Sequence, residues 1–229
     1  MTVKLLLCLG ASVLVAVLLR HALGRLGHWL RDAGRDWPWA GLGIGRGRVE
    51  AGAVCMALSL LALPSDPVLW LGSLLLLGSL LLLAIIDLEC GLLPDWLTLP
   101  LLWTGLLFNL FVARTPLNEA VLGAVAGYAV LWLLYWIFFL LSGREGLGYG
   151  DFKLLAALGA WLGVAALPLV LLTSALTGLL AGGILMLLGR MKRSEALPFG
   201  PFLAVSGWVA WIGDARLQDW MTWQSRWWG

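Results

Sequence analysis

Charged side chains are scarce in this chain: 12% of its 229 residues are Asp, Glu, Lys or Arg, and 61% are hydrophobic. A soluble domain usually carries about 25% charged residues, so this composition excludes an ordinary soluble protein. The formal net charge of +2 is also too small to indicate nucleic-acid binding. We therefore expect a membrane protein whose surroundings are lipid and that has no nucleic-acid partner.

Metal-ligating residues are scarce as well. The chain has three cysteines, Cys8, Cys55 and Cys90, none of them in a CxxC pair, and two histidines, His21 and His28. A structural zinc site needs four closely spaced ligands, which this set does not supply. A disulfide framework is equally unexpected, because Cys8 and Cys55 fall inside apolar stretches. We predict no metal site and no zinc.

Long hydrophobic runs dominate the rest of the chain. Apolar runs of about 18 residues or more are typical of transmembrane helices. Polar breaks and Pro/Gly clusters, among them Pro64–Pro67 and Pro168, divide the chain into about eight such helices, so we predict an all-α polytopic membrane protein. The first is expected to be a retained helix, because no cleavage site typical of a signal peptide follows it. The expected spans are 3–19, 51–63, 68–86, 97–113, 117–141, 152–167, 169–189 and 198–213.

The distribution of basic residues predicts the orientation of these spans. If the amino terminus lies outside, the inside loops are 20–50, 87–96, 142–153 and 190–197. Those loops hold 11 of the 15 basic residues and leave Lys4, Arg114, Arg216 and Arg226 outside. Cytoplasmic loops carry an excess of Lys and Arg, so this orientation is favoured. It places the chain positions 87 and 151 on the cytoplasmic side.

Two of the few acids stand where apolar spans meet water. Asp87 follows one long apolar span, and Asp151 precedes another. Ionisable groups at such places are costly and often functional. Asp151 also fits a helix N-cap, as does Asp95, for which we prefer the cap. Asp87 is harder to explain structurally, because the helix dipole opposes a negative charge at a C-terminal end. Spacing alone leaves Asp87, Glu89 and Asp95 open as the partner of Asp151.

Two carboxyl groups in one low-dielectric site share a proton and titrate as a pair. Such a pair can activate a water molecule with one member and protonate a carbonyl oxygen with the other, as in aspartic proteases. The dipole argument makes Asp87 the protonated member in the resting state and Asp151 the ionised one. The alternative from another class is a proton-coupled transporter. Transporters place such acids near the bilayer midplane between inverted repeats, however, and no repeat is visible here.

Glycines and prolines flank the second acid and a later span. Gly146, Gly148 and Gly150 alternate directly before Asp151, which would allow a positive φ and let a peptide backbone lie beside the acid. A phosphate-binding loop is disfavoured, because no Lys-Ser/Thr pair follows and no strand precedes. The segment 198–201 reads either as a helix start with an early proline or as a substrate-contacting element.

Several motifs in order resemble one known family. Asp87 is followed by LLPDWLTLPLLW (residues 92–103), by EGLGYGDFKLLAALGAW (residues 145–161) and by PFGP (residues 198–201). Together these closely resemble the type IV prepilin peptidases, over residues 68–212. Members of that family are GxGD-type intramembrane aspartyl proteases. They remove the basic leader from type IV prepilins and from type II secretion pseudopilins on the cytoplasmic face of the bacterial inner membrane.

The resemblance implies roles for individual residues. The catalytic pair of the family matches Asp87 and Asp151, and supporting or substrate-binding positions match Gly148, Gly150, Lys153, Pro198 and Gly200. The membrane-embedded protease core then spans 51–213. The first helix and a short basic cytoplasmic segment form 1–50, and a Trp-rich tail, expected to anchor at the interface, forms 214–229. The implied substrates are prepilins or pseudopilins, and the oligomeric state stays open.

The chain departs from many family members in one segment. They carry two CxxC pairs with bound zinc between the first and second spans, a region also linked to N-methylation of the trimmed amino terminus with S-adenosylmethionine. Segment 20–50 here is short and contains no cysteine. Some shorter members also lack these pairs, so proteolysis without a cofactor is expected and methylation stays open. A GxGD protease acting on other transmembrane segments is a further alternative, against which the LPDWLTLP stretch argues.

Overall fold

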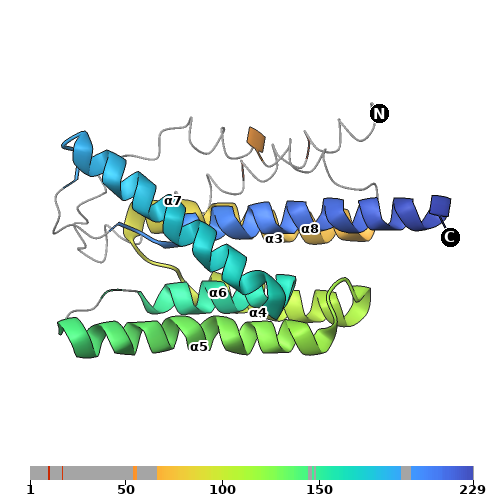
Figure 1. Ribbon diagram of the computed structural model, residues 1–229, viewed down its shortest axis with the longest axis horizontal. Helices are drawn as coiled ribbons and strands as arrows, with labels where there is room; N and C mark the ends of the chain where they lie inside the picture. The colour runs from red at the N-terminus through yellow and green to blue at the C-terminus, as the bar shows by residue number, and fades with distance from the viewer. Residues whose placement is uncertain are drawn as a thin grey trace. The chain divides into compact units, whose positions relative to one another are not determined.

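Helices are the only regular secondary structure in the described residues, joined by short turns and connections, and no strand occurs there (Figure 1). The expected spans 3–19 and 51–63 lie outside that part, apart from single residues, and so does segment 20–50. The computed structural model describes Gly10, Val17, Val54, Cys55 and residues 66–143, 146, 148–191 and 197–228, with side chains up to residue 214.

The chain divides into two compact units, residues 1–90 with 211–229 and residues 91–210. In the first unit, α3 (Pro67–Cys90) begins where the backbone N–H of Val68 donates to Oδ1 of Asp66 at 3.0 Å, an N-cap that the sequence analysis did not predict. The side chain of Ser73 in α3 accepts a hydrogen bond from Nε1 of Trp211 at 2.8 Å, and both residues are fully buried. This bond ties α3 to α8 (Gly200–Trp228), whose later residues belong to the same unit.

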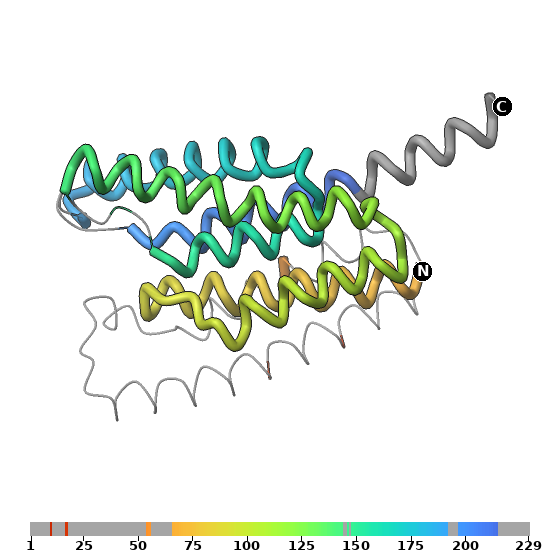
Figure 2. The backbone as a smooth tube through the Cα atoms, turned by 90° about the horizontal axis from the view of Figure 1, so that it is seen from below, coloured from red at the N-terminus to blue at the C-terminus, as the bar shows by residue number. Residues whose placement is uncertain are grey.

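The second unit is organised around a short central helix. It contains α4 (Asp95–Val112), α5 (Leu117–Ser142), α6 (Tyr149–Leu162), the 3-10 turn η2 (Val164–Ala166), α7 (Leu167–Leu187) and the start of α8. Figure 2 shows α4 and α5 joined at one end by the short connection 113–116. Asp151, Phe152 and all of 154–161 are buried, so α6 forms the core against which α4 and α5 pack.

Glycines allow α5 and α6 to approach closely. A Cβ on Gly123 would collide with the carbonyl of Gly159, and one on Gly127 would lie 2.6 Å from the carbonyl oxygen of Leu155. Gly123 and Gly127 form the small-xxx-small spacing that is common where transmembrane helices touch, because lipid supplies no hydrophobic drive between helices and close backbone contact must replace it. The contact of α5 with α6 therefore depends on these three glycines.

The C-terminal end of α6 is held by buried polar side chains. Nδ2 of Asn109 donates to the carbonyl oxygens of Ala160 at 2.8 Å and Trp161 at 3.2 Å. Oδ1 of Asn109 accepts from the backbone N–H of Thr115 at 3.1 Å, and Nε1 of Trp161 donates to the carbonyl of Leu101 at 2.9 Å. The last carbonyls of a helix need such partners, above all where no water is present.

Four predicted spans are confirmed as helices that are long and apolar enough to cross a membrane. These are α3, α4, α5 and η2 with α7, for the expected spans 68–86, 97–113, 117–141 and 169–189. The protein is thus a polytopic all-α membrane protein, as predicted.

The remaining described spans differ from prediction. The expected span 152–167 is replaced by α6, whose 14 residues rise only about 21 Å, less than the roughly 30 Å hydrocarbon core. The break lies at Gly163, with φ +84, and Pro168 starts α7. The expected span 198–213 corresponds to the first part of α8, which continues through residue 228 into the expected tail.

Candidate active site

Asp87 lies in the last turn of α3, as the sequence analysis predicted. The helix ends at Cys90, and Gly91 follows with φ +60, a left-handed conformation that glycine adopts without a Cβ penalty. Asp87 is buried at 5% exposure, whereas Glu89 is only partly buried. The carboxyl group of Asp87 is therefore withdrawn from water at the negative end of its helix.

Asp151 is the third residue of α6, and its capping interpretation is wrong. The N-cap position belongs to Gly148, with no side-chain capping hydrogen bond, while the backbone N–H of Asp151 donates to the carbonyl of Gly148 at 3.1 Å. Asp151 is 6% exposed. A buried carboxyl group in the first turn lies near the positive end of the helix dipole without serving as its cap.

The capping interpretation of Asp95 is wrong for the same reason. Pro94 occupies the N-cap of α4 without a side-chain bond, and Asp95 is the first helical residue. Its Oδ1 instead accepts a hydrogen bond from Nζ of Lys153 at 2.5 Å. The predicted supporting residue Lys153 is therefore paired within the chain.

None of the three glycines before Asp151 has a positive φ, so this predicted reason for them is wrong. Gly148 has φ −80, and the positive-φ glycines of the described chain are Gly91, Gly143, Gly163 and Gly189. Close packing explains two of the three. A Cβ on Gly146 would lie 2.6 Å from the ring of Phe138, and one on Gly150 would lie 2.6 Å from Cβ of Leu93.

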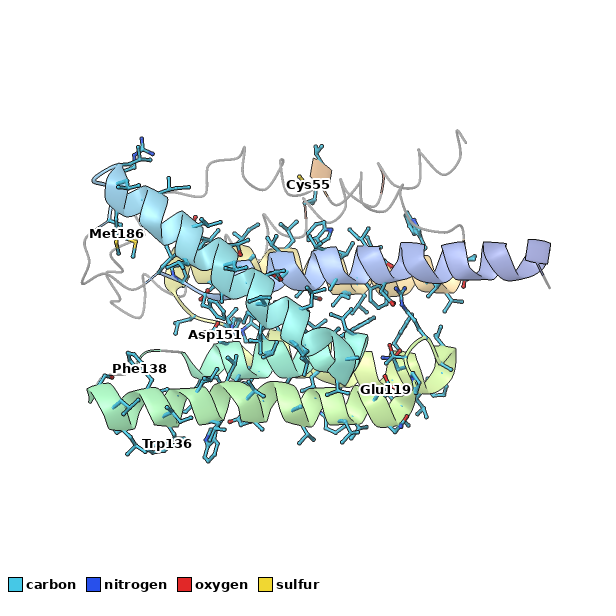
Figure 3. All side chains as sticks on the ribbon, viewed as in Figure 1. Cys55, Glu119, Trp136, Phe138, Asp151 and Met186 are labelled. Atoms are coloured by element: carbon cyan, nitrogen blue, oxygen red, sulfur yellow. The ribbon has the colours of Figure 1, made fainter. Side chains whose placement is uncertain are left out.

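Gly148 differs from its two neighbours in the motif. It is exposed, and the one atom that a Cβ there would approach within 4 Å is Oδ2 of Asp151, at 3.6 Å. The backbone beside the carboxylate is therefore bare at this position. Figure 3 shows Asp151 at the start of α6, toward the Phe138 end of α5 and away from Glu119.

Aromatic side chains surround the start of α6, a feature that the sequence analysis missed. The ring of Tyr149 contacts those of Tyr135 and Phe152, with centroids 5.3 and 5.4 Å apart, and Tyr128 meets Phe152 edge-on at 5.9 Å. Tyr135 is buried, whereas Tyr149 is 53% exposed. Tyr128 and Tyr135 are seven residues apart, about two turns, so the sequence places them on one face of α5, but it did not indicate what that face meets.

The segment with Pro198 and Gly200 packs against α7. Gly200 is buried and begins α8, with Pro201 in its first turn, and Leu203 N–H donates to the carbonyl of Phe199 at 3.2 Å. A Cβ on Gly178 of α7 would lie 3.4 Å from the ring of Phe202. The geometry agrees with the helix-start interpretation, and a contact of Pro198 with substrate stays a prediction.

Burial separates two acids from all others. Asp87 and Asp151 are the only buried acidic side chains among the described residues. Asp87 belongs to the first unit and Asp151 to the second. Within the part of the chain that the structure covers, no group of three His, Cys, Asp or Glu side chains could hold a metal ion.

Helices able to span a membrane, with two buried carboxyl groups near helix ends, define the class of this molecule: a polytopic membrane protein with acids withdrawn from water. Residues 74–183 match the type IV leader peptidase family. This match confirms the resemblance seen in the sequence.

Curated relatives carry one common name, prepilin leader peptidase/N-methyltransferase. The protein of Aeromonas salmonicida (strain A449) is 58% identical over 150 residues, which are 66% of this chain and 52% of the relative. That of Dickeya chrysanthemi is 51% identical over 184 residues, 75% of this chain and 64% of the relative. That of Stutzerimonas stutzeri is 50% identical over 143 residues, which are 62% of this chain and 50% of the relative. The chain thus spans about half to two thirds of their length. No solved structure matches it.

Proposed function

We propose that this protein is a membrane aspartic endopeptidase that cleaves the basic leader from type IV prepilins, from type II secretion pseudopilins or from both. The observation that carries the proposal is the burial of Asp87 and Asp151 alone among the described acids, within a leader peptidase domain. The names of the relatives support prepilin as substrate over the transporter and over proteases that cut other transmembrane segments.

The proposed mechanism uses the two carboxyl groups as one unit. The ionised carboxylate takes a proton from a water molecule, whose oxygen attacks the scissile carbonyl carbon. The protonated carboxyl group donates its proton to the carbonyl oxygen, and a tetrahedral diol forms. Collapse of the diol breaks the C–N bond: the leaving amine receives a proton from the acid that took one from water, and the other carboxylate takes the proton of a diol hydroxyl, which restores the starting protonation states. No covalent enzyme intermediate and no cofactor are needed.

We propose that the two acids converge on one scissile bond, because the family's catalytic pair matches Asp87 and Asp151. We place the pair at the cytoplasmic face of the bacterial inner membrane, in agreement with the distribution of basic loops. There the junction between the basic leader and the apolar segment of a prepilin would meet the bare backbone at Gly148.

N-methylation of the new amino terminus is a second proposed activity, and it rests on the names of the relatives. It would require S-adenosylmethionine. Segment 20–50, which the resemblance links to this activity, lies outside the described residues, and we assign no described residue to the cofactor.

Incubation of the full chain in membranes with a purified prepilin tests both activities. Mass spectrometry should show the loss of the leader alone, cut at its junction with the apolar segment. An unchanged prepilin mass would refute the peptidase proposal, and a cut elsewhere in the apolar segment would favour a protease of another specificity. Labelled S-adenosylmethionine in the same reaction decides methylation, because cleavage without label transfer would refute it.

A further inference from the structure

The start of α6 is attached to the start of α4 at two points. Leu93 packs directly against Gly150: a Cβ on Gly150 would lie only 2.6 Å from Cβ of Leu93. Nζ of Lys153 donates to Oδ1 of Asp95 at 2.5 Å. Both contacts therefore join the stretch 93–95 to the first turns of the helix that carries Asp151.

Helical spacing places these contacts beside the acid without covering it. Gly150 and Lys153 are three residues apart and share one face of α6. Asp151 lies about 100° from Gly150 around the helix and is nearly opposite Lys153. The stretch 93–95 thus holds the side of the first turn that faces away from the buried carboxyl group of Asp151. Lys153 is consequently poorly placed to share in the chemistry of that group.

The Asp95–Lys153 ion pair contributes too little stability to account for its presence. The side chain of Lys153 is 26% exposed and that of Asp95 58% exposed. Ion pairs of such exposure typically contribute about 0–1 kcal/mol. A lysine near the start of a helix also opposes the helix dipole, which is a local cost. A role in positioning the first turn of α6 explains why a lysine stands at position 153, because there it pairs with Asp95.

We propose that Asp95 and Lys153 are positioning residues for Asp151. Their ion pair, together with the contact of Leu93 with Gly150, sets the register of the first turn of α6 and so aims the Asp151 carboxyl group at the scissile bond. This inference rests on the proposed peptidase function. It explains why the acid of the LPD stretch pairs with a residue 58 positions later rather than capping its own helix.

The test compares Asp95→Asn, Lys153→Met and the exchanged pair Asp95→Lys with Lys153→Asp, each in the full chain in membranes. Cleavage of a purified prepilin is measured as kcat and KM, with thermal denaturation alongside. Each single variant should lower kcat about tenfold, a misplacement effect, while KM and Tm stay near the wild-type values. The exchanged pair should regain most of kcat, and Asp95→Glu should retain part of it.

Three results would overturn the inference. Wild-type kcat in both single variants removes the positioning role. A raised KM at unchanged kcat would show that the residues bind the leader instead. A fall in kcat that follows a fall in Tm, without recovery in the exchanged pair, would show a purely structural role.

A second readout keeps this inference separate from the peptidase proposal. A spin label at Tyr149→Cys, in a background without the native cysteines, reports the order of the first turn whether or not the protein cleaves. Asp95→Asn should broaden its motion, and the exchanged pair should restore it. Restored order in a protein that leaves prepilin intact would refute the function and keep the positioning role, and an unresponsive label would refute positioning alone.

Discussion

The two ends of α6 are built in opposite ways. At its C-terminal end, Asn109 and Thr115 bond to the last carbonyls, and α5 meets the helix through Gly159. At its N-terminal end, Gly148 occupies the cap position without a side-chain bond, and both Gly148 and Tyr149 are exposed. One end is closed by buried polar groups, whereas the other offers bare backbone beside a buried acid. We propose that the closed end fixes the helix and that the open end holds Asp151, the proposed catalytic acid, in place.

Loss of either acid should have the largest effect. Asp151→Asn and Asp87→Asn preserve shape but remove the proton-transferring oxygen, so prepilin cleavage should fall by about 100- to 10,000-fold. The proteins should stay inserted and folded. Asp66→Asn is the matched control, because asparagine caps α3 as well as aspartate does and cleavage should persist. Near-normal cleavage by either active-site variant, measured by mass spectrometry, contradicts a two-carboxylate mechanism.

Overpacking at the closed end should cost stability rather than chemistry. A Cβ on Gly159 would collide with the backbone of Gly123, so Gly159→Ala should destabilise the protein by about 1–3 kcal/mol or more. Gly183→Ala in α7 meets nothing within 4 Å and should leave Tm unchanged or raised. Thermal denaturation in detergent checks both. Equal Tm values for the two variants would remove the argument for a glycine-dependent contact.

Removal of the polar closure should cost somewhat less. Asn109 is 1% exposed and bonds to two carbonyls and one N–H, so Asn109→Ala leaves buried partners unsatisfied at about 1–3 kcal/mol. The exposed Asn118→Ala should change Tm little. The kcat of the protein that remains folded should stay close to that of the wild type. A tenfold loss of kcat at unchanged Tm would mean that this end also shapes the site.

A methyl group at the open end should affect substrate more than stability. Gly148→Ala meets only Oδ2 of Asp151, so Tm should hold within the error of the measurement while cleavage falls several-fold through KM. Gly150→Ala, which pushes on Leu93, should lower Tm as well. If the two variants behave alike, the distinction between bare and packed backbone is wrong.

The sequence predicted those helices that consist of an apolar run ending at a polar break. The spans that became α3, α4, α5 and α7 follow this rule, and Asp87 and Asp151 were found because acids are conspicuous beside such runs. The early end of α6 was not predicted, because 163–167 remains apolar and hydropathy alone does not register the positive φ of Gly163. The assignment of catalytic roles to the two acids stays a prediction.

Contacts between distant positions were beyond the sequence. Asn109 reads as one polar residue within an apolar span, and its bonds reach residues 51 and 52 positions later. Asp95 has a plausible local role as a cap, and only the fold shows its partner Lys153. Local patterns predict local roles, and here tertiary packing replaced them. Gly148 and Gly150 look alike in the motif, and only their neighbours in the fold distinguish them: Gly150 packs against Leu93, whereas Gly148 does not.

The convergence of Asp87 and Asp151 is the claim on which this account depends, and cross-linking measures it directly. Cysteines replace both acids in a chain whose native cysteines are serines, and a short bifunctional thiol reagent is added to the membranes. We predict an intramolecular cross-link between 87 and 151. We expect none between 151 and a cysteine at Asp66, which lies about 32 Å from residue 87 along α3. Cross-linking at 66 but not at 87, or at neither position, would contradict the proposed site.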